Sequence, residues 1–423
     1  MDEEKQPQVY LDYNATTPLD RTVLRSIHDA LQDAWGNPSS SHPLGRRAND
    51  VIKQSRQSIA EMIGAQNSEI IITSGGTEAN NMVFLTAIRY YQEFLEMSEN
   101  HALKGSKPQF IISNQEHDSV RLPVAHFAQV QAAEECIVNV EKDSGMVTSQ
   151  AIKDAVKPNT CLVSVMLANN ETGIIQPISE ITQVIKSLNK ERKIAGLPRI
   201  LLHTDAAQAI GKIRVDVNDL GVDYLTIVGH KFYAPRIGAL YVSCLGENSG
   251  PPLFPMLFGG GQERNYRPGT ENTGMIAGLG QASQLVVEHL DEYQIHMKKL
   301  RDYLETRLEE VFGSDNIHIN GKFPTSERLP NTCNVSFIGK DLQGRAVLSR
   351  VKYLLASVGA ACHSDRGSKP SPILEALGIP CHVAINAIRM SVGRETTTGD
   401  IDIVVQDLKD TIDRMKQEAG NAS

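Results

Sequence analysis

The stretch that decides the fold class lies between residues 161 and 203, where CLVSVML (161–167), SEITQVIKSLNKERKIA (179–195) and ILLH (200–203) follow one another. The first and third segments are short, nearly continuous apolar runs, which are typical of strands buried on both faces of a sheet. The middle segment has the length and pattern of a helix. A strand, a helix and a strand in this order predict a βαβ unit with parallel strands.

The same alternation continues on both sides of this unit. Helical patterns cover residues 48–63 and 77–90, whereas the polar segment 93–107 is predicted to be an exposed loop. We therefore predict an α/β fold whose large domain, residues 20–285, has a mainly parallel sheet flanked by helices. The remaining strands are predicted at 69–74, 110–113, 136–140, 224–228 and 239–243.

The pattern changes after residue 285. Leucines recur every fourth residue from 300 to 308, as on one face of a helix, and residues 331–337 read as a strand. Thr397, followed three residues later by an acid, is a plausible start for the last helix. Residues 286–423, together with 1–19, are predicted to form a smaller α+β C-terminal domain.

Composition excludes several function classes. The chain has 423 residues, with 42 basic and 50 acidic side chains and a formal net charge of −8. Without a basic block, nucleic acid is not an expected partner, and no apolar run is long enough to span a membrane. The acidic N-terminus resembles neither a secretory signal nor a mitochondrial presequence, so we expect the cytosol. Six scattered cysteines predict neither a disulfide framework nor a metal site.

The first segment with chemical potential is Ser74-Gly-Gly-Thr-Glu78, between a predicted strand and a predicted helix. Gly76 would let the backbone approach an anion closely. The helix N-terminus offers unpaired N–H groups, and the Thr77 hydroxyl adds a donor. A phosphate would fit there, although an ordinary glycine-containing turn explains this segment equally well when it is taken alone.

Two further polar residues follow predicted strands. Asp205 comes after the strand at 200–203, and Lys231 comes shortly after the strand at 224–228. The carboxyl ends of parallel strands form the crevice where α/β proteins bind ligands. Taken singly, Asp205 could cap a helix and Lys231 could extend to solvent. A phosphate cradle, a strand-end acid and a strand-end lysine together predict a pyridoxal 5′-phosphate site, with the acid at the pyridine nitrogen and the lysine holding the aldehyde as a Schiff base.

The chain also resembles a known family over most of its length. Seven motifs are similar to those of the cysteine desulfurase and selenocysteine lyase family, which belongs to the class V aminotransferase-like, fold-type I pyridoxal phosphate-dependent transferases. They are YLDYNATTP (10–18), SGGTE (74–78), EH (116–117), NNETG (169–173), DAAQ (205–208), GHK (229–231) and GGGQER (259–264).

The resemblance implies roles for further residues. His117 would stack on the pyridine ring, Gln208 would contact the cofactor near the ring oxygen, and His230 would help to bind the phosphate. His117 could otherwise be a core histidine, and Arg389 could otherwise form a surface ion pair. Substrate binding would fall to Asn14, Asn170 and Arg389, the last as a clamp on the amino-acid carboxylate.

The resemblance also implies a homodimer. Arg267 and Thr270 would complete the phosphate pocket of a neighbouring subunit, although a glycine-rich surface loop is the plainer interpretation of this segment. One position departs from the family. Val228 stands where many desulfurases have a serine that donates to the phosphate, so that contact is not expected here.

Cys362 lies in SVGAACHSDRGSK (357–369), a small and polar segment that reads as a loop. His363, Arg366 and Lys369 would favour its thiolate. The family places its catalytic cysteine at this position. A merely exposed thiol, or a metal pair with Cys381 and its neighbouring histidine, are the alternatives.

The implied reaction is the cleavage of L-selenocysteine to L-alanine and selenide, with selenium passing to a reduced acceptor, either a protein or a thiol. Lys231 would move the Cα proton, and Cys362 would attack the selenium or protonate it as it leaves. The sequence ACHSD at 361–365 resembles that of selenocysteine lyases, whereas many desulfurases have Ala-Cys-Thr-Ser, and Asp118 stands where desulfurases often have a basic or neutral residue. This resemblance favours selenium over sulfur. Asp118 could equally cap the following helix. The alternative function is a cysteine desulfurase that releases persulfide sulfur from L-cysteine.

Overall fold

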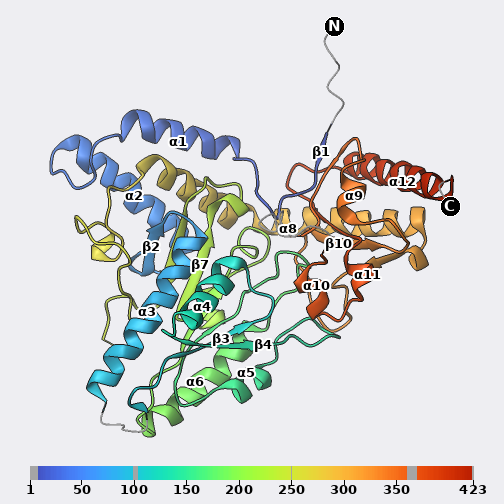
Figure 1. Ribbon diagram of the computed structural model, residues 1–423. Helices are drawn as coiled ribbons and strands as arrows, with labels where there is room; N and C mark the ends of the chain where they lie inside the picture. Colours follow the sequence, from blue (N-terminus) through green and yellow to red (C-terminus); the bar gives the residue numbers. More distant parts are fainter. Residues whose placement is uncertain (1–7, 99–102, 249, 360–368, 422–423) are drawn as a thin grey trace.

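The computed structural model describes residues 8–98, 103–248, 250–359 and 369–421. Figure 1 shows two groups of elements, with the large sheet and α3 on one side and β10 and α12 on the other. The long helix α8 (Thr273–Phe312) passes between them, so it crosses the predicted boundary at residue 285. The division into two domains at that residue stays a prediction.

The first group is built on a seven-stranded sheet in the order β2-β8-β7-β6-β5-β3-β4. Neighbouring strands from β7 to β4 are parallel, and β8 alone pairs antiparallel with both of its neighbours. The predicted α/β fold with a mainly parallel sheet is therefore confirmed. The strands are β2 (Ile70–Thr73), β3 (Gln109–Ser113), β4 (Glu134–Val138), β5 (Thr160–Ser164), β6 (Leu201–Asp205), β7 (Tyr224–Val228) and β8 (Gly238–Val242).

Helices cover both faces of this sheet, as the apolar strands require. Phe110 and Ile112 of β3 belong to one hydrophobic cluster with side chains of α3, whereas Ile111 between them belongs to another with side chains of α2 and α6. This alternation follows from the two-residue period of a strand. The helices are α1 (Arg21–Asp33), α2 (Pro43–Met62), α3 (Gly76–Met97), α4 (Asp118–Gln129), α5 (Ser149–Ala155), α6 (Ile178–Ile194) and α7 (Val217–Leu220).

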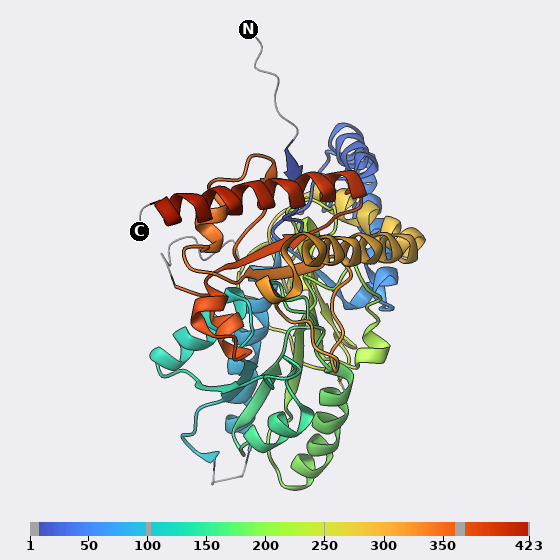
Figure 2. The same cartoon turned by 90° about the vertical axis from the view of Figure 1, so that its right-hand side faces the viewer.

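The second group has its own hydrophobic cluster, to which α8, β10, β12 and α12 contribute and which Val9 and Leu11 join from the N-terminal segment. Helix α12 lies beside α8 (Figure 2). An antiparallel sheet has the order β12-β10-β9, and β1 pairs in parallel with β11. The elements are β1 (Val9–Tyr10), β9 (Ile317–Ile319), β10 (Thr332–Phe337), β11 (Leu354–Leu355), β12 (Ala387–Ser391), α9 (Gly344–Leu348), α10 (Pro372–Ala376), α11 (Cys381–Ala384) and α12 (Thr398–Asn421).

Two local predictions have different outcomes. The start signal of the last helix is confirmed, because the Asp400 N–H donates to Thr397 Oγ1 at 3.1 Å and the Thr397 N–H donates to Asp400 Oδ2 at 2.8 Å. The exposed loop predicted for residues 93–107 is wrong at its start, since α3 continues to Met97. Leu95 holds this last turn in place by packing against the cluster that contains Phe110.

No helix in the described part of the chain is long and apolar enough to cross a membrane.

Candidate active site

A cavity of about 290 Å³ opens where β6 and β7 end and α3 begins. This is the edge of the sheet at which the sequence predicted a site. The cavity gathers residues that are far apart in the chain, and the segment before α1 and strand β12 reach into it from the second group of elements. The predicted residues that line it are Asn14, Gly76, Thr77, His117, Asn170, Asp205, Gln208, His230, Lys231 and Arg389.

The start of α3 has the form of an anion cradle. A Cβ atom on Gly76 would lie 2.6 Å from Val228 Cγ2, closer than real Cβ contacts come, so only glycine lets this backbone pass so near β7. The first N–H groups of a helix have no partner within the helix. Together with Thr77 on the cavity wall, they suit a phosphate. Val228 also lines the cavity, where it offers a methyl group rather than a hydroxyl.

Asp205 stands at the last position of β6 and is 7% exposed. Its Oδ1 accepts a hydrogen bond from the Ala207 N–H at 2.9 Å, which is the cap-like contact that the sequence left open. Its Oδ2 accepts from Asn80 Nδ2 at 3.0 Å, and the carboxylate still lines the cavity. Two donors thus fix an acid where a cationic ring nitrogen would need one.

Asn80 ties this acid to His117. The amide of Asn80 also donates to Ser119 Oγ at 2.8 Å, and Ser119 donates to His117 Nδ1 from its hydroxyl at 2.8 Å and from its backbone N–H at 3.1 Å. Because Nδ1 accepts, a neutral ring carries its proton on Nε2. His117 therefore caps α4 through Nδ1 while its ring lines the cavity.

Asp118 is the first residue of α4 and does not cap it, since His117 does. The Asp118 carboxylate pairs with Arg121 of the same helix, with Oδ1 2.7 Å from a guanidinium nitrogen. Asp118 is not among the described residues that line the cavity. Asp118 follows His117 in the sequence, and its catalytic role stays a prediction.

Lys231 extends into the cavity and not to solvent. Its Nζ donates to the backbone oxygens of Asn14 and Ala15, both at 2.8 Å. Its neighbour His230 has a pKa lowered to about 4, chiefly by burial and further by the nearby cations Lys231 and Arg236. At neutral pH the imidazole is uncharged, so it would bind an anion by hydrogen bonding.

Arg389 lies in the middle of β12 and is 1% exposed, so the surface alternative is wrong. Its guanidinium donates to Asp12 Oδ1 at 2.7 Å and to the Asn170 carbonyl oxygen at 3.0 Å. Within the described chain its Nε has no hydrogen-bond partner. The guanidinium lines the cavity and has five N–H groups, more than these two oxygens use, so it has capacity left for a carboxylate.

Asn14 is less available than the sequence suggested. Its Nδ2 donates to Thr332 Oγ1 at 2.8 Å, and its Oδ1 accepts from Asn331 at 3.0 Å and from Lys212 at 2.9 Å. The side chain is therefore engaged by protein groups. The predicted contact of Asn14 with substrate stays a prediction.

Besides Asp118, two further predicted residues lie outside the cavity wall. Arg267 donates from Nε to Glu78 Oε1 of α3 at 2.8 Å, and Thr270 is exposed, so neither lines the cavity of its own chain. Cys362 lies outside the described residues. Before this cysteine, Ser357 pairs with the backbone of Arg389 in β12, and the Ser357 hydroxyl donates to Asp12 Oδ1 at 3.1 Å.

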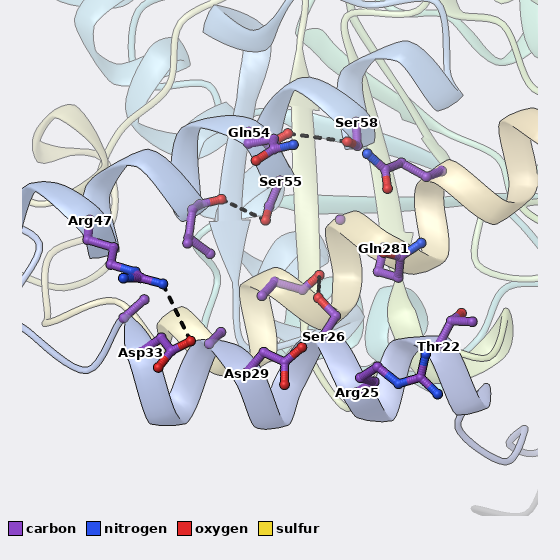
Figure 3. Close-up of a pocket in the computed structure, with 16 residues that line it drawn as sticks. Thr22, Arg25, Ser26, Asp29, Asp33, Arg47, Gln54, Ser55, Ser58 and Gln281 are labelled. Atoms are coloured by element: carbon purple, nitrogen blue, oxygen red, sulfur yellow. Dashed lines mark hydrogen bonds and ion pairs between the residues drawn. The ribbon is translucent and has the colours of Figure 1, made fainter.

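A second cavity, of about 530 Å³, lies between α1, α2 and α8 (Figure 3). Its polar groups bond mainly to one another, for example Arg47 with Asp33 at 3.4 Å and Ser26 with the Ala277 carbonyl at 3.3 Å. None of the predicted site residues lines it. The cavity around Lys231 is therefore the candidate active site.

Sequence reasoning missed three residues that support this site. Asn80 and Lys212 are both buried behind the cavity wall, and only the apolar surroundings of Lys212 in AIGKI (209–213) hinted at burial. Glu116 was noted only as a neighbour of His117. Burial raises the pKa of Glu116 to about 8, and Asp205 adds to this rise, so the carboxyl group holds a proton at neutral pH.

Comparisons with known proteins agree with this geometry. The sequence profile described as aminotransferase class-V matches residues 9–404. Human selenocysteine lyase is 56% identical, over 97% of this chain and 93% of the human protein. A cysteine desulfurase, IscS of Dictyoglomus turgidum, is 37% identical over 97% of this chain and 95% of its own length. A solved NifS-like protein superimposes with a TM-score of 0.81 at 30% identity, covering 96% of this chain and 99% of that structure.

Proposed function

Because this chain belongs to the class V aminotransferase family, whose members use pyridoxal 5′-phosphate, we propose that it is a lyase that cleaves L-selenocysteine to L-alanine and selenide. The observation that carries the proposal is one cavity that joins Lys231, Asp205 and the start of α3 to the buried Arg389. Relatives named selenocysteine lyase are 54–56% identical to the chain, against 34–37% for the cysteine desulfurases. The desulfurase alternative is therefore not favoured.

The residues present fit the cofactor. The N–H groups at the start of α3, with Gly76 and Thr77, would hold its phosphate, and neutral His230 would add a hydrogen bond. Asp205 would keep the ring nitrogen protonated. The bound cofactor then supplies a sink for the electrons of a bond broken at the substrate Cα. Val228 leaves the phosphate one donor short of the desulfurase pattern.

The other residues act on the substrate. Arg389 would hold the carboxylate through N–H groups of its guanidinium that protein oxygens do not use, which orients the Cα–H bond. Lys231 Nζ would take the proton from Cα and return it, and His117 would pack against the ring. Cys362 would either attack the selenium or give a proton to it as it leaves.

The preference for selenium is proposed to involve Asp118. A selenol is largely ionised near neutral pH, whereas a free thiol with pKa ~8.5 is mostly protonated. The carboxylate of Asp118, held by Arg121, would alter the charge around the leaving group and Cys362. We expect D118N to lower the ratio of L-selenocysteine to L-cysteine turnover. The exposed control D154N should leave that ratio unchanged, and an unchanged ratio in D118N would remove Asp118 from this role.

We also propose a homodimer in which Arg267 and Thr270 complete the partner's phosphate pocket. Both residues lie outside the cavity of their own chain, and Phe258, nearby in sequence, is 83% exposed. Co-expression of K231A and R267A chains tests this. Their heterodimer would contain one intact site if Arg267 acts across the interface, so activity should return. If Arg267 acts within its own chain, the mixture stays inactive.

The selenium acceptor is proposed to be a thiol reductant or an accepting protein, and the location the cytosol. The five described cysteines, at 136, 161, 244, 333 and 381, are free thiols, which suits a reducing compartment. Cell fractionation with detection of the native protein tests the location, and recovery in an organelle fraction would contradict it.

Lys231 carries the cofactor assignment, and chemical reduction tests it directly. Borohydride treatment of the cofactor-loaded protein should leave a pyridoxyl group on Lys231, located by peptide mass mapping. K231A should lose the visible absorbance and the turnover, whereas the exposed control K190A should keep both. A pyridoxyl group on another lysine, or turnover by K231A, would overturn the assignment.

A further inference from the structure

A second lysine lies buried behind the wall of the active-site cavity. Lys212, in the turn that follows β6, is 3% exposed. Its Nζ donates to Gln208 Oε1 at 2.7 Å and to Asn14 Oδ1 at 2.9 Å. These two oxygens are its only hydrogen-bond partners in the described chain, and no carboxylate pairs with it there.

The chemistry of Lys212 matches these two partners. Burial, with Lys231 and Arg389 adding their repulsion, lowers the pKa of Lys212 well below its ordinary value. The two oxygens accept hydrogen bonds from its Nζ, which lowers the cost of burying this polar side chain.

The contact with Lys212 decides which end of the Gln208 amide faces the site. Because Oε1 is turned to Lys212, Nε2 points the other way and donates to the Asn14 backbone oxygen at 3.0 Å. The same backbone oxygen accepts a hydrogen bond from Lys231 at 2.8 Å. The donor end of Gln208 is thus held next to the atoms that surround Lys231.

We propose that Lys212 is a positioning residue that holds the amide of Gln208 with its N–H groups toward the cofactor's ring oxygen. The proposal rests on the proposed function, because it needs pyridoxal phosphate in the cavity. An amide with the opposite orientation would place a carbonyl oxygen against an electron-rich ring oxygen, and the two would repel. Lys212 excludes that orientation, because its own N–H groups need the oxygen of Gln208.

The test is a pH titration of the visible absorbance of the cofactor-loaded protein. A donor that faces an ionised oxygen favours the ionised form. Its loss in K212M should therefore raise the midpoint of the titration by about one unit, the effect of a hydrogen bond to a charged group. The control K157M, which removes an exposed lysine, should leave the midpoint unchanged. We also expect K212M to lower kcat by about tenfold with little change in KM.

A double variant separates positioning from general damage. If Lys212 acts through Gln208, then Q208M alone should shift the midpoint, and K212M should add nothing in that background. Should K212M fail to fold, K212Q replaces it, because its amide can keep only part of the donor pair. An unchanged midpoint in whichever variant folds, or additive shifts in the double variant, would overturn the proposal.

These outcomes are distinct from failure of the proposed function. A wild-type protein that binds the cofactor and cleaves L-selenocysteine supports that function whatever K212M does. An unshifted K212M would then overturn only the role of Lys212. A wild-type protein that binds no pyridoxal phosphate would overturn both.

Discussion

Replacement of Gly76 by alanine tests the phosphate cradle with a magnitude that the structure supplies. The new Cβ would lie 2.6 Å from Val228 Cγ2, whereas carbon atoms in contact prefer ~3.5–4.0 Å. Either the start of α3 or β7 must therefore move by about 1 Å. Such overpacking costs roughly 1–3 kcal/mol. If this cost falls on the bound state, the dissociation constant of the cofactor rises by roughly 5- to 150-fold.

The matched control is the double variant G76A/V228A. Removal of the valine methyls leaves Thr226 Cγ2, 3.6 Å away, as the nearest atom to the new Cβ, and that is an ordinary contact. We expect V228A alone to bind the cofactor nearly as well as wild type, and the double variant to recover most of the affinity lost in G76A. The coupling between two contacting residues should be roughly 1–2 kcal/mol.

The assay is a titration of cofactor-free protein with pyridoxal phosphate, followed by visible absorbance. Thermal unfolding of the cofactor-free variants separates a loss of affinity from a loss of folded protein. Unchanged affinity in G76A would refute the cradle. A double variant no better than G76A would refute the clash with Val228 as its cause.

Three further outcomes follow from the site. R389K keeps a charge but loses the fork that holds Asp12 and a substrate carboxylate, so KM should rise roughly 10- to 100-fold in steady-state assays; an unchanged KM would place the carboxylate elsewhere. Glu116 contributes stability that is fully present below its ordinary pKa of 4.5 and is lost as the pH rises through its raised pKa of about 8. The unfolding free energy of E116Q should therefore fall less between pH 5 and 9 than that of wild type. Denaturant titrations at several pH values measure this, and an equal fall of the unfolding free energy in both proteins would contradict it. C362A should keep the visible absorbance of the cofactor bound to Lys231 but release no selenide. Normal selenide release would show that the Cys362 thiol has no catalytic role.

Much of the fold could be predicted because its signals are local. The run Tyr224–Val228 is continuous, apolar and bounded by turns, and β7 has the same bounds. Asp205 and Lys231 could be paired as site residues because parallel strands end at a common edge. The loop expected from residue 93 failed because Leu95 packs on a cluster formed by distant residues.

Residues behind the cavity could not be predicted for a related reason. Asn80 acts through Ser119 and Asp205, which lie 39 and 125 positions away in the chain. Lys212 bonds to nearby Gln208, but it is buried against Asn14, 198 positions away, so no local pattern marks its role. The burial of Arg389 was indicated by its apolar neighbours, but its pairing with Asp12 brings together the two ends of the chain. Contacts of this kind depend on the finished tertiary structure.

The most direct test of the central claim is the release of alanine from L-selenocysteine and from L-cysteine, measured side by side with the cofactor-loaded protein and a thiol reductant. Selenide and sulfide are quantified in the same samples. The account predicts equal amounts of alanine and selenide from L-selenocysteine and little alanine from L-cysteine. Comparable alanine from both amino acids would contradict it and identify a desulfurase-like enzyme.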